Sequence, residues 1–211
     1  MKISKGYLAV IIILAVIILD QVLKIWVKTN FYLGESYYIA DWFQLRFIEN
    51  NGMAFGMEFG SKLFLTLFRI VAVGALIYYI WRIKSTRLVT TGYIVCLSLI
   101  TAGALGNIID CMFYGIVFDN PLPPATATFL PAEGYQTLFH GRVVDMFYFP
   151  LFSFNWPDWM PFVGGERFEF FKPIFNFADA AISVGIITLI LFYSKFLVAP
   201  SKLDAPDEET I

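Results

Sequence analysis

The sequence predicts an all-α polytopic membrane protein with four transmembrane helices, a small extracytoplasmic β element and long outer loops. Of its 211 residues, 58% are hydrophobic, 18% are aromatic and only 15% are charged, whereas soluble domains carry about 25% charged residues. The mean hydropathy is +0.68. Such a chain cannot cover its apolar surface with polar groups, which excludes a soluble globular domain and a disordered chain. The net charge of −2 lacks the basic footprint of a nucleic-acid partner.

Four apolar stretches are long enough to cross a bilayer, which takes about 20 residues. The first has the lysine-rich start of a secretory signal, but Asp20 and Lys24 stand where a cleavage site would need small residues. We therefore expect this helix to be retained. A single membrane-embedded domain is expected over residues 1–211. Its predicted spans are residues 7–27, 63–81, 88–110 and 174–198.

The distribution of Lys and Arg predicts the orientation in the membrane. Basic residues are concentrated at the N-terminus, in the short connection 82–87 and around the end of the last span (Lys195 and Lys202), and are sparse in the two long connections. Positively charged flanks stay in the cytoplasm. We therefore expect both termini and the tail 199–211 in the cytoplasm. The connections 28–62 and 111–173 are expected outside.

The two long connections have unusual compositions. Residues 40–57 alternate partly between polar and apolar side chains and contain the turn signal Asn51-Gly52, which predicts a small β element at the membrane surface. Residues 146–171 are dense in Phe, Trp, Tyr and Pro. This density suits the headgroup level of a bilayer, and it leaves open whether the segment also contacts a ligand.

Ionisable residues inside the first predicted span need an explanation, because each costs about 2.5–3.5 kcal/mol in hydrocarbon on insertion scales. Asp20 and Lys24 are four residues apart and share one helix face. Two interpretations remain open. The residues form a self-contained ion pair with Lys24 reaching towards the interface, or they form one wall of a polar site.

The third and fourth spans carry polar residues at their outer ends. Gly103, Asn107 and Asp110 are spaced by four and three residues, so they form one stripe on the third helix. Gly103 allows a close helix approach. Asn176 and Asp179 repeat the Asn-x-x-Asp spacing at the start of the last helix. An Asn alone favours a contact between helices, whereas the added carboxylates favour a functional site.

Three carboxylates flank these helix ends, namely Asp110, Asp145 and Asp179, without an equal number of basic residues. Two carboxylates that converge share one proton. This is the electrostatic arrangement of an aspartic protease, in which one carboxylate activates water and the other protonates the carbonyl oxygen. With one histidine, His140, and two cysteines outside any zinc-type spacing, we expect no metal and no cofactor.

Five motifs in order resemble the lipoprotein signal peptidase family, also called signal peptidase II. They are Asp20-x-x-x-Lys24, Asn50-x-Gly52-x-Ala54-Phe55, Gly103-x-x-Gly106-Asn107-x-x-Asp110, Val143-Val144-Asp145 and Phe175-Asn176-x-Ala178-Asp179. The resemblance implies an endopeptidase of the bacterial inner membrane with its site near the outer leaflet and Asp145 and Asp179 as catalytic residues. The supporting residues expected are Asp20, Lys24, Asn50, Gly52, Gly103, Asn107, Asp110, Arg142, Asn176 and Ala178.

The same resemblance implies the substrate and the inhibitor. The family removes the signal peptide of a prolipoprotein just before a cysteine that carries diacylglycerol, and globomycin blocks it by occupying that site. Membrane lipid is the other expected partner, and nothing in the sequence demands more than a monomer.

The chain departs from the family pattern at two places. Cys111 stands where most members carry an Arg beside the aspartate of the third helix. We expect Arg142 to replace that charge partner of Asp110. An insertion lies near residues 113–139, and a further aromatic excess lies at 148–172. These insertions are expected to change the loop geometry and to leave the catalytic pair in place.

A small transporter or proton-conducting protein is the alternative function, because buried Asp, Lys and Asn also mark ion paths. The acidic residues cluster at the outer helix ends rather than through the membrane depth, and no inverted repeat is visible. Both observations favour the peptidase. A presenilin-type protease is disfavoured because the chain lacks a Gly-x-Gly-Asp motif.

Overall fold

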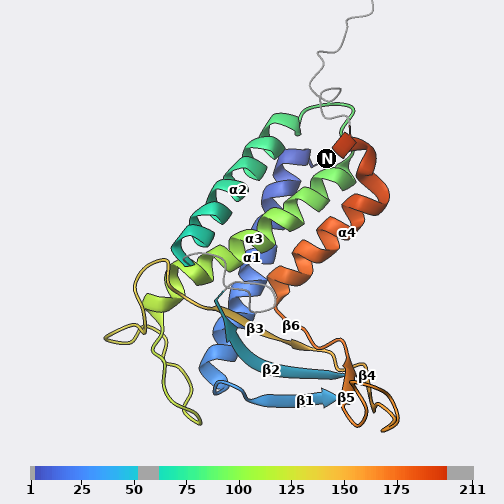
Figure 1. Ribbon diagram of the computed structural model, residues 1–211. Coiled ribbons are helices and arrows are strands. Elements are labelled where there is room, and N and C mark those ends of the chain that lie inside the picture. The colour runs from blue at the N-terminus through green and yellow to red at the C-terminus, as the bar shows by residue number, and fades with distance from the viewer. Residues whose placement is uncertain (1–2, 52–61, 199–211) are drawn as a thin grey trace, which may run out of the picture.

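The computed structural model describes residues 3–51 and 62–198 and forms a helical bundle with a β-sheet at one end (Figure 1). Four helices are long and apolar enough to cross a membrane, which confirms the predicted class. They are α1 (Lys5–Asn30), α2 (Lys62–Ile83), α3 (Thr91–Val117) and α4 (Phe177–Val198). The predicted tail 199–211 lies outside the described residues.

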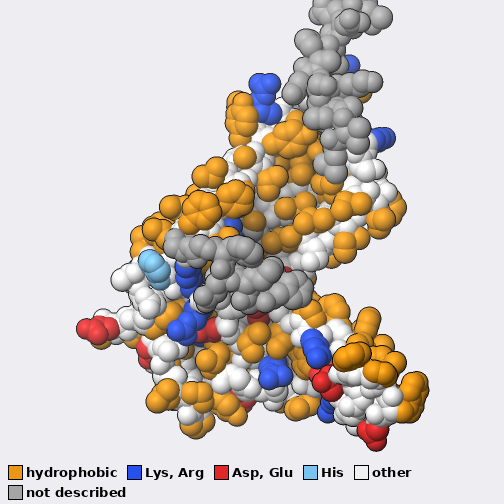
Figure 2. Space-filling model, in the orientation of Figure 1, with side chains coloured by type: hydrophobic (Ala, Val, Ile, Leu, Met, Phe, Trp, Pro, Cys, Tyr) orange, Lys and Arg blue, Asp and Glu red, His pale blue; other side chains and the backbone are white. Residues whose placement is uncertain are grey.

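Helix α3 is the centre of the bundle, because α1, α2 and α4 all pack against it. Helices α1, α2 and α4 carry many apolar side chains that point outward from the bundle, as Figure 2 shows for one face of the molecule. This pattern suits a lipid environment, in which helices have no need to hide apolar groups. On the same face, the acidic side chains gather at the sheet end (Figure 2).

Small residues set how closely α3 and α4 approach. A Cβ atom on Gly103 would collide with the carbonyl oxygen of Ala178, and one on Gly106 would lie 3.2 Å from the Ala178 Cβ. Glycine at both positions therefore lets the first turn of α4 rest on the backbone of α3. This contact places the start of α4 beside the polar stripe of α3.

The sheet at the end of the bundle has four antiparallel strands in the order β1-β2-β3-β6, and a separate hairpin pairs β4 with β5 (Figure 1). In the β2–β3 pair, Ile48 lies opposite Asp145 and Asn50 lies opposite Val143. The strands are β1 (Ser36–Ala40), β2 (Phe43–Asn50), β3 (Val143–Tyr148), β4 (Phe152–Asn155), β5 (Arg167–Phe170) and β6 (Ile174–Phe175).

The β structure is more extensive than the sequence analysis predicts. The expected element at 40–57 supplies only part of it, since the first hairpin occupies residues 36–50 and β3 and β6 come from the second long connection. These two strands join residues far apart in sequence, and such pairing leaves little local signal. Gly52, the second residue of the predicted Asn51-Gly52 turn, lies outside the described residues.

Two helix boundaries also differ from the prediction. Helix α4 begins at Phe177 rather than at 174, because Ile174 and Phe175 pair with β3 instead. Helix α3 continues to Val117 rather than ending near 110. Backbone N–H groups of the insertion donate to carbonyl oxygens of the last turn of α3. Gln136 donates to Gly115, and Leu130 donates to Val117. The insertion therefore satisfies carbonyl groups that a helix end leaves open.

Candidate active site

Asn176 caps the first turn of α4 and positions Asp179. The side-chain Oδ1 of Asn176 accepts a hydrogen bond from the Asp179 backbone N–H at 2.8 Å, and Asp179 Oδ2 accepts one from the Asn176 N–H at 3.3 Å. This reciprocal pair is the capping-box arrangement, with Asn and Asp in the roles of Ser and Glu. Forming the helix start therefore also orients the Asp179 carboxylate.

Asp145 lies on β3 and exposes only 3% of its surface. Its Oδ1 accepts a hydrogen bond from Asn176 Nδ2 at 2.7 Å, and its Oδ2 accepts one from Asn50 Nδ2. Asn50 and Asp145 are diagonal neighbours on the same face of the β2–β3 pair. The strand register therefore brings the Asn50 amide to the carboxylate.

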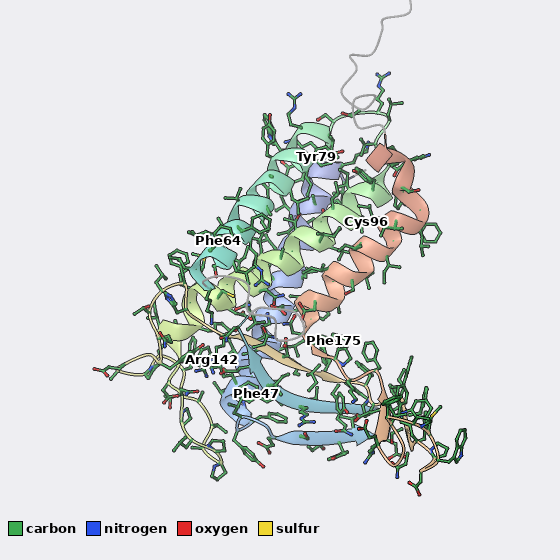
Figure 3. The ribbon with its side chains drawn as sticks, in the orientation of Figure 1. Phe47, Phe64, Tyr79, Cys96, Arg142 and Phe175 are labelled. Atoms are coloured by element: carbon green, nitrogen blue, oxygen red, sulfur yellow. The ribbon has the colours of Figure 1, made fainter. Side chains whose placement is uncertain are left out.

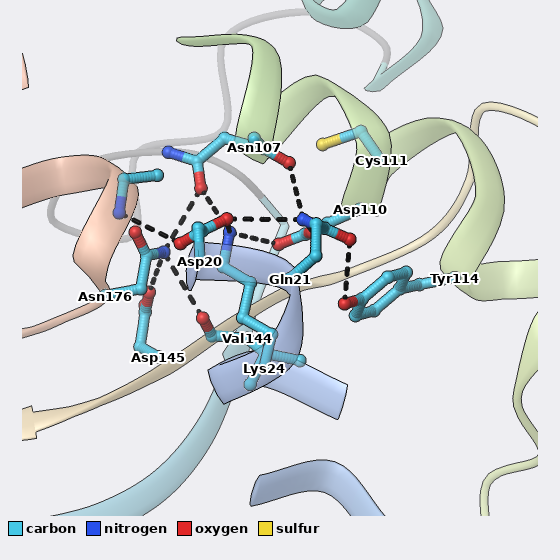
Figure 4. Close-up of polar contacts among 12 residues, drawn as sticks. Asp20, Gln21, Lys24, Asn107, Asp110, Cys111, Tyr114, Val144, Asp145 and Asn176 are labelled. Carbon is cyan, nitrogen blue, oxygen red and sulfur yellow. Dashed lines mark hydrogen bonds and ion pairs between the residues drawn. The ribbon is translucent and has the colours of Figure 1, made fainter. Parts of the chain in front are cut away.

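Asn107 on α3 links the two carboxylates to the rest of the site. Its Nδ2 donates to Asp179 Oδ1 at 2.8 Å, while its Oδ1 accepts from Asn176 Nδ2 at 3.1 Å. Asp145 and Asp179 are thus linked through the Asn176 and Asn107 side chains, although they come from a strand and a helix. Figure 4 shows the part of this network that joins Asp145, Asn176 and Asn107.

Burial and a neighbouring carboxylate act on the acidity of Asp145. Loss of solvent on burial is the largest effect, and the charge of Asp179 adds to it. Together they raise the pKa of Asp145 to about 7. Hydrogen bonds from Asn50 and Asn176 and the charge of Lys24 lower the pKa, but their effects are weaker. A carboxyl group with this pKa keeps a proton near neutral pH. Asp179 is only partly buried. The two carboxylates therefore have the unequal environments that acid–base chemistry uses.

Lys24 joins α1 to α3 below this network. Its ammonium lies 2.8 Å from Asp20 Oδ2, 2.7 Å from Asp110 Oδ2 and 2.9 Å from Asn107 Oδ1. The Lys24, Asp20 and Asp110 side chains are fully buried. Asp20 and Lys24 are therefore not a self-contained pair, because Lys24 reaches into the bundle and also contacts Asp110 and Asn107.

Asp20 and Gln21 extend the cluster to neighbouring helices. Asp20 Oδ1 accepts a hydrogen bond from the Ala178 backbone N–H in the first turn of α4 at 2.9 Å. Gln21 Nε2 donates to Asp110 Oδ1 at 2.9 Å, and Gln21 Oε1 accepts from the Tyr114 hydroxyl at 3.1 Å (Figure 4). Gln21 is not among the residues expected from the sequence, although an amide close to Asp20 and Lys24 in an apolar helix is itself a signal.

The expectation for Arg142 is wrong. Its guanidinium NH1 lies 3.0 Å from Glu49 Oε2 and 3.2 Å from Asn120 Oδ1, whereas the cation beside Asp110 is Lys24. Arg142 precedes β3, and the strand alternation directs it to the sheet face opposite Asp145. The nearby Cys111 sulfur lies 3.9 Å from the Arg69 guanidinium of α2.

The structure therefore brings most of the predicted residues into one site. Asp145, Asp179, Asn50, Asn107 and Asn176 are linked by hydrogen bonds, with Lys24, Asp20 and Asp110 as an adjoining ionic cluster. Gly103 and Ala178 form the close contact between α3 and α4. Arg142 lies in a different cluster, and Gly52 is outside the described ranges. Across residues 3–51 and 62–198, no group of three or more His, Cys, Asp or Glu is arranged for a metal ion.

Comparisons with known proteins match this architecture. The family model described as signal peptidase (SPase) II matches residues 12–195. The lipoprotein signal peptidase of Porphyromonas gingivalis is 51% identical, over 99% of this chain and 93% of its own length. The lipoprotein signal peptidase of Pelodictyon phaeoclathratiforme is 32% identical, over 93% of this chain and 95% of its own.

A solved structure of a bacterial membrane enzyme, determined by the in meso method, is 26% identical to this chain and superposes with a TM-score of 0.60. The match covers 96% of this chain and 94% of the chain in that structure. The matches span the helices and the sheet together. With four candidate spans and this similarity, the protein is a multi-pass bacterial membrane protein. The chain belongs to the signal peptidase II family of aspartic peptidases.

Proposed function

We propose that this protein is an intramembrane aspartic endopeptidase that removes the signal peptide from prolipoproteins, with Asp145 and Asp179 as its catalytic pair. One observation carries the assignment. The two carboxylates come from β3 and α4 and meet at Asn176, whose side-chain amide donates to Asp145 and whose backbone N–H donates to Asp179. Asn107 completes the link, because it binds both Asp179 and the Asn176 amide. Such a pair can hold one proton and has no need of a metal.

The environments of the two carboxylates suggest their roles. Asp145, whose pKa is raised to about 7 by burial and by Asp179, holds the shared proton and donates it to the carbonyl oxygen of the scissile peptide. The partly buried Asp179 acts as the carboxylate that takes a proton from the attacking water. The water oxygen adds to the peptide carbon, and the leaving amine receives the proton when the C–N bond breaks.

The remaining predicted residues act as support. Asn50, Asn107 and Asn176 orient the carboxylates through their amides. The buried cluster of Lys24, Asp20 and Asp110 fastens α1 to α3 and α4. Removing a partner from such a cluster leaves a buried charge uncompensated, so the cluster resists displacement of the helices.

The substrate class follows from the place of the site. The sheet lies at one end of the spanning helices (Figure 1), and the two carboxylates belong to β3 and to the first turn of α4. We assign this end to the outer leaflet from the distribution of basic residues. A prolipoprotein whose cysteine carries diacylglycerol presents both lipid and peptide at that level, and we expect cleavage just before the cysteine. A globomycin-type inhibitor would occupy the same site. We assign the enzyme to the inner membrane with both termini cytoplasmic and as a monomer.

The alternative of a proton-conducting protein finds less support. The other half of the bundle is packed with apolar side chains such as Ile94, Leu97 and Leu189. Ser98 and Thr101, which lie between the two halves, donate their hydroxyl groups to carbonyls of their own helix. A proton path would need polar groups continuing from the site through this region.

Cleavage of a diacylglyceryl-modified prolipoprotein tests the proposal, followed as a mobility shift on a gel. Wild type should give a shift that globomycin abolishes, and Asp145→Asn and Asp179→Asn should each lose it while remaining folded. Asp41→Asn, the same change at an exposed residue of the β1–β2 connection, is the matched control and should cleave normally. An unchanged shift in either dyad variant would show that the pair is misassigned. No cleavage by folded wild-type enzyme on a competent substrate would favour the transport function.

A further inference from the structure

A second buried ionic cluster lies on the opposite face of the sheet from Asp145. Glu49 on β2 contacts the ammonium of Lys28 from α1, and its other oxygen lies 3.0 Å from the guanidinium of Arg142. The side chains of Lys28 and Glu49 expose only 2% and 3% of their surface. Arg142, with 33% exposed, closes the cluster towards the outside. One carboxylate thus holds two cations from different segments.

Aromatic rings enclose the cationic groups of this cluster. The Lys28 ammonium lies 5.2 Å from the ring centres of Phe118 and Tyr135 and 5.7 Å from that of Phe47. The Arg142 guanidinium lies 5.0 Å from the Tyr135 ring. Cation–π contacts of this kind compensate part of the lost hydration. Figure 3 shows Arg142 and Phe47 on the same side of the molecule, where β2 passes the end of α1.

The insertion folds around the same cluster. The Ala127 N–H donates to the carbonyl oxygen of Lys28 at 3.3 Å, and the Tyr135 hydroxyl accepts from the Arg142 N–H at 2.7 Å. Arg142 also donates to Asn120 Oδ1 at 3.2 Å. The added segment is therefore tied at three points to the residues that surround Glu49.

Strand geometry connects this cluster to the candidate active site. Glu49 pairs with Val144 and Asn50 pairs with Val143 across β2 and β3. Because side chains alternate along a strand, Glu49 and Arg142 lie on one face of the pair while Asn50 and Asp145 lie on the other. A shift of Glu49 would therefore move the Asn50 amide, which donates to Asp145 Oδ2.

We propose that Glu49 is a positioning residue that, by binding Lys28 and Arg142, holds the end of β2 so that Asn50 is aimed at Asp145. This inference rests on the proposed function. The insertion takes part by enclosing the cluster, so that in this chain an added loop helps to align a supporting residue. Neither Lys28 nor Glu49 stands in any motif that carried the family resemblance.

Replacing Glu49 by Gln tests the proposal through kinetics. Glu49→Gln keeps the shape and removes the charge between the two cations. Misplacing a reacting group by about 1 Å costs up to about 100-fold, so we expect kcat to fall about 10- to 100-fold with KM within about threefold. Glu49→Asp should restore part of the loss. Glu35→Gln is the matched control, because Glu35 precedes the same sheet and its carboxylate accepts a hydrogen bond from the local backbone N–H of Tyr32, an acceptor role that the Gln amide oxygen can keep. It should behave as wild type.

A double-mutant cycle separates positioning from general support of the fold. If Glu49 acts through Asn50, then Glu49→Gln should have little further effect on single-turnover cleavage in an Asn50→Ala enzyme. An equal loss in both backgrounds would overturn the proposal. If Glu49→Gln does not fold, the same cycle is run with Arg142→Gln, which changes the more exposed member of the cluster. A small further effect in the Asn50→Ala enzyme would support the proposal, and an equal loss in both backgrounds would overturn it. Cleavage that is lost with Asp145→Asn but insensitive to Glu49→Gln would reject this inference alone. Cleavage that persists in Asp145→Asn would instead reject the proposed function.

Discussion

Asn176 and Asp179 hydrogen-bond to each other twice across the first turn of α4, and each also binds a group outside that helix. Asn176 Nδ2 reaches Asp145, and Asp179 Oδ1 accepts from Asn107. The cap that starts the helix is therefore also the bridge between the two candidate catalytic carboxylates. A substitution of Asn176 can therefore be chosen to remove its contact with Asp145 while keeping its capping oxygen, which separates the effect on activity from the effect on stability.

Replacement of Asn176 should distinguish capping from bridging. Asn176→Ala loses both the cap and the amide donors, and loss of a cap costs about 1 kcal/mol. Asn176→Ser keeps a capping oxygen but loses the donor to Asp145. We expect both variants to lose about 100-fold or more in cleavage rate, as for other oriented donors, and only the Ala variant to lose the cap's stability. Thermal unfolding and cleavage assays measure the two effects. High activity in Asn176→Ser would contradict the bridging role.

Lys24 should be essential for stability because its three acceptors include two buried carboxylates. Lys24→Met leaves the charges of Asp20 and Asp110 without a cation, which costs about 3–5 kcal/mol in comparable buried pairs. Adding Asp110→Asn should recover part of this loss. The free energy of unfolding in detergent measures both variants. Lys172→Met, at an exposed position, is the control and should change stability by no more than about 0.5 kcal/mol. A Lys24→Met enzyme as stable as the control would show that Lys24 is not the cation that compensates the buried charges of Asp20 and Asp110.

Asp145 should make stability depend on pH in a defined direction. Its pKa is raised from 3.8 to about 7, so the folded state binds this proton more tightly than the unfolded chain does. The contribution is favourable at low pH and is lost as the pH rises from about 4 through about 7. Asp145→Asn removes the dependence, because the amide does not ionise.

We therefore expect Asp145→Asn to match wild type in stability near pH 4 and to exceed it by a few kcal/mol at pH 8, since one pKa unit is worth about 1.4 kcal/mol. Unfolding curves collected across this pH range test the expectation. A stability difference that stays constant with pH would show that the Asp145 pKa is unshifted. In the wild-type enzyme, cleavage should decline above about pH 7 as Asp145 loses its proton.

Gly103 should tolerate no side chain, because a Cβ there would collide with the Ala178 carbonyl oxygen and lie 2.7 Å from the Ile182 side chain. Gly103→Ala should destabilise the protein by about 1–3 kcal/mol, the usual cost of overpacking, and should lower activity by displacing the start of α4. Gly74→Ala is the matched control, since nothing lies within 4 Å of a Cβ atom there. It should be neutral or slightly stabilising, because Ala favours a helix more than Gly does. Equal effects of the two substitutions would argue against the close contact.

Local spacing accounts for the parts of the site that the sequence predicts well. Gly103, Asn107 and Asp110 share a face because an α-helix repeats every 3.6 residues, and the same rule pairs Asp20 with Lys24. Both groups come together in the structure through the Lys24 ammonium. The network around Asp145 is different. Its partner Asn50 comes from a strand more than ninety residues earlier, and only the β2–β3 register aligns them.

The sequence by itself determined the four spans, the polar faces of the first and third helices and the Asn-x-x-Asp start of α4, because hydropathy and helical periodicity are local properties. Only the tertiary structure decided that Lys24 is the cation of Asp110, that Arg142 belongs to Glu49, and that α4 begins after β6. Those outcomes depend on which helix ends and strand faces meet. A cation pairs with the carboxylate that packing brings within reach, and spacing along the chain does not specify that choice.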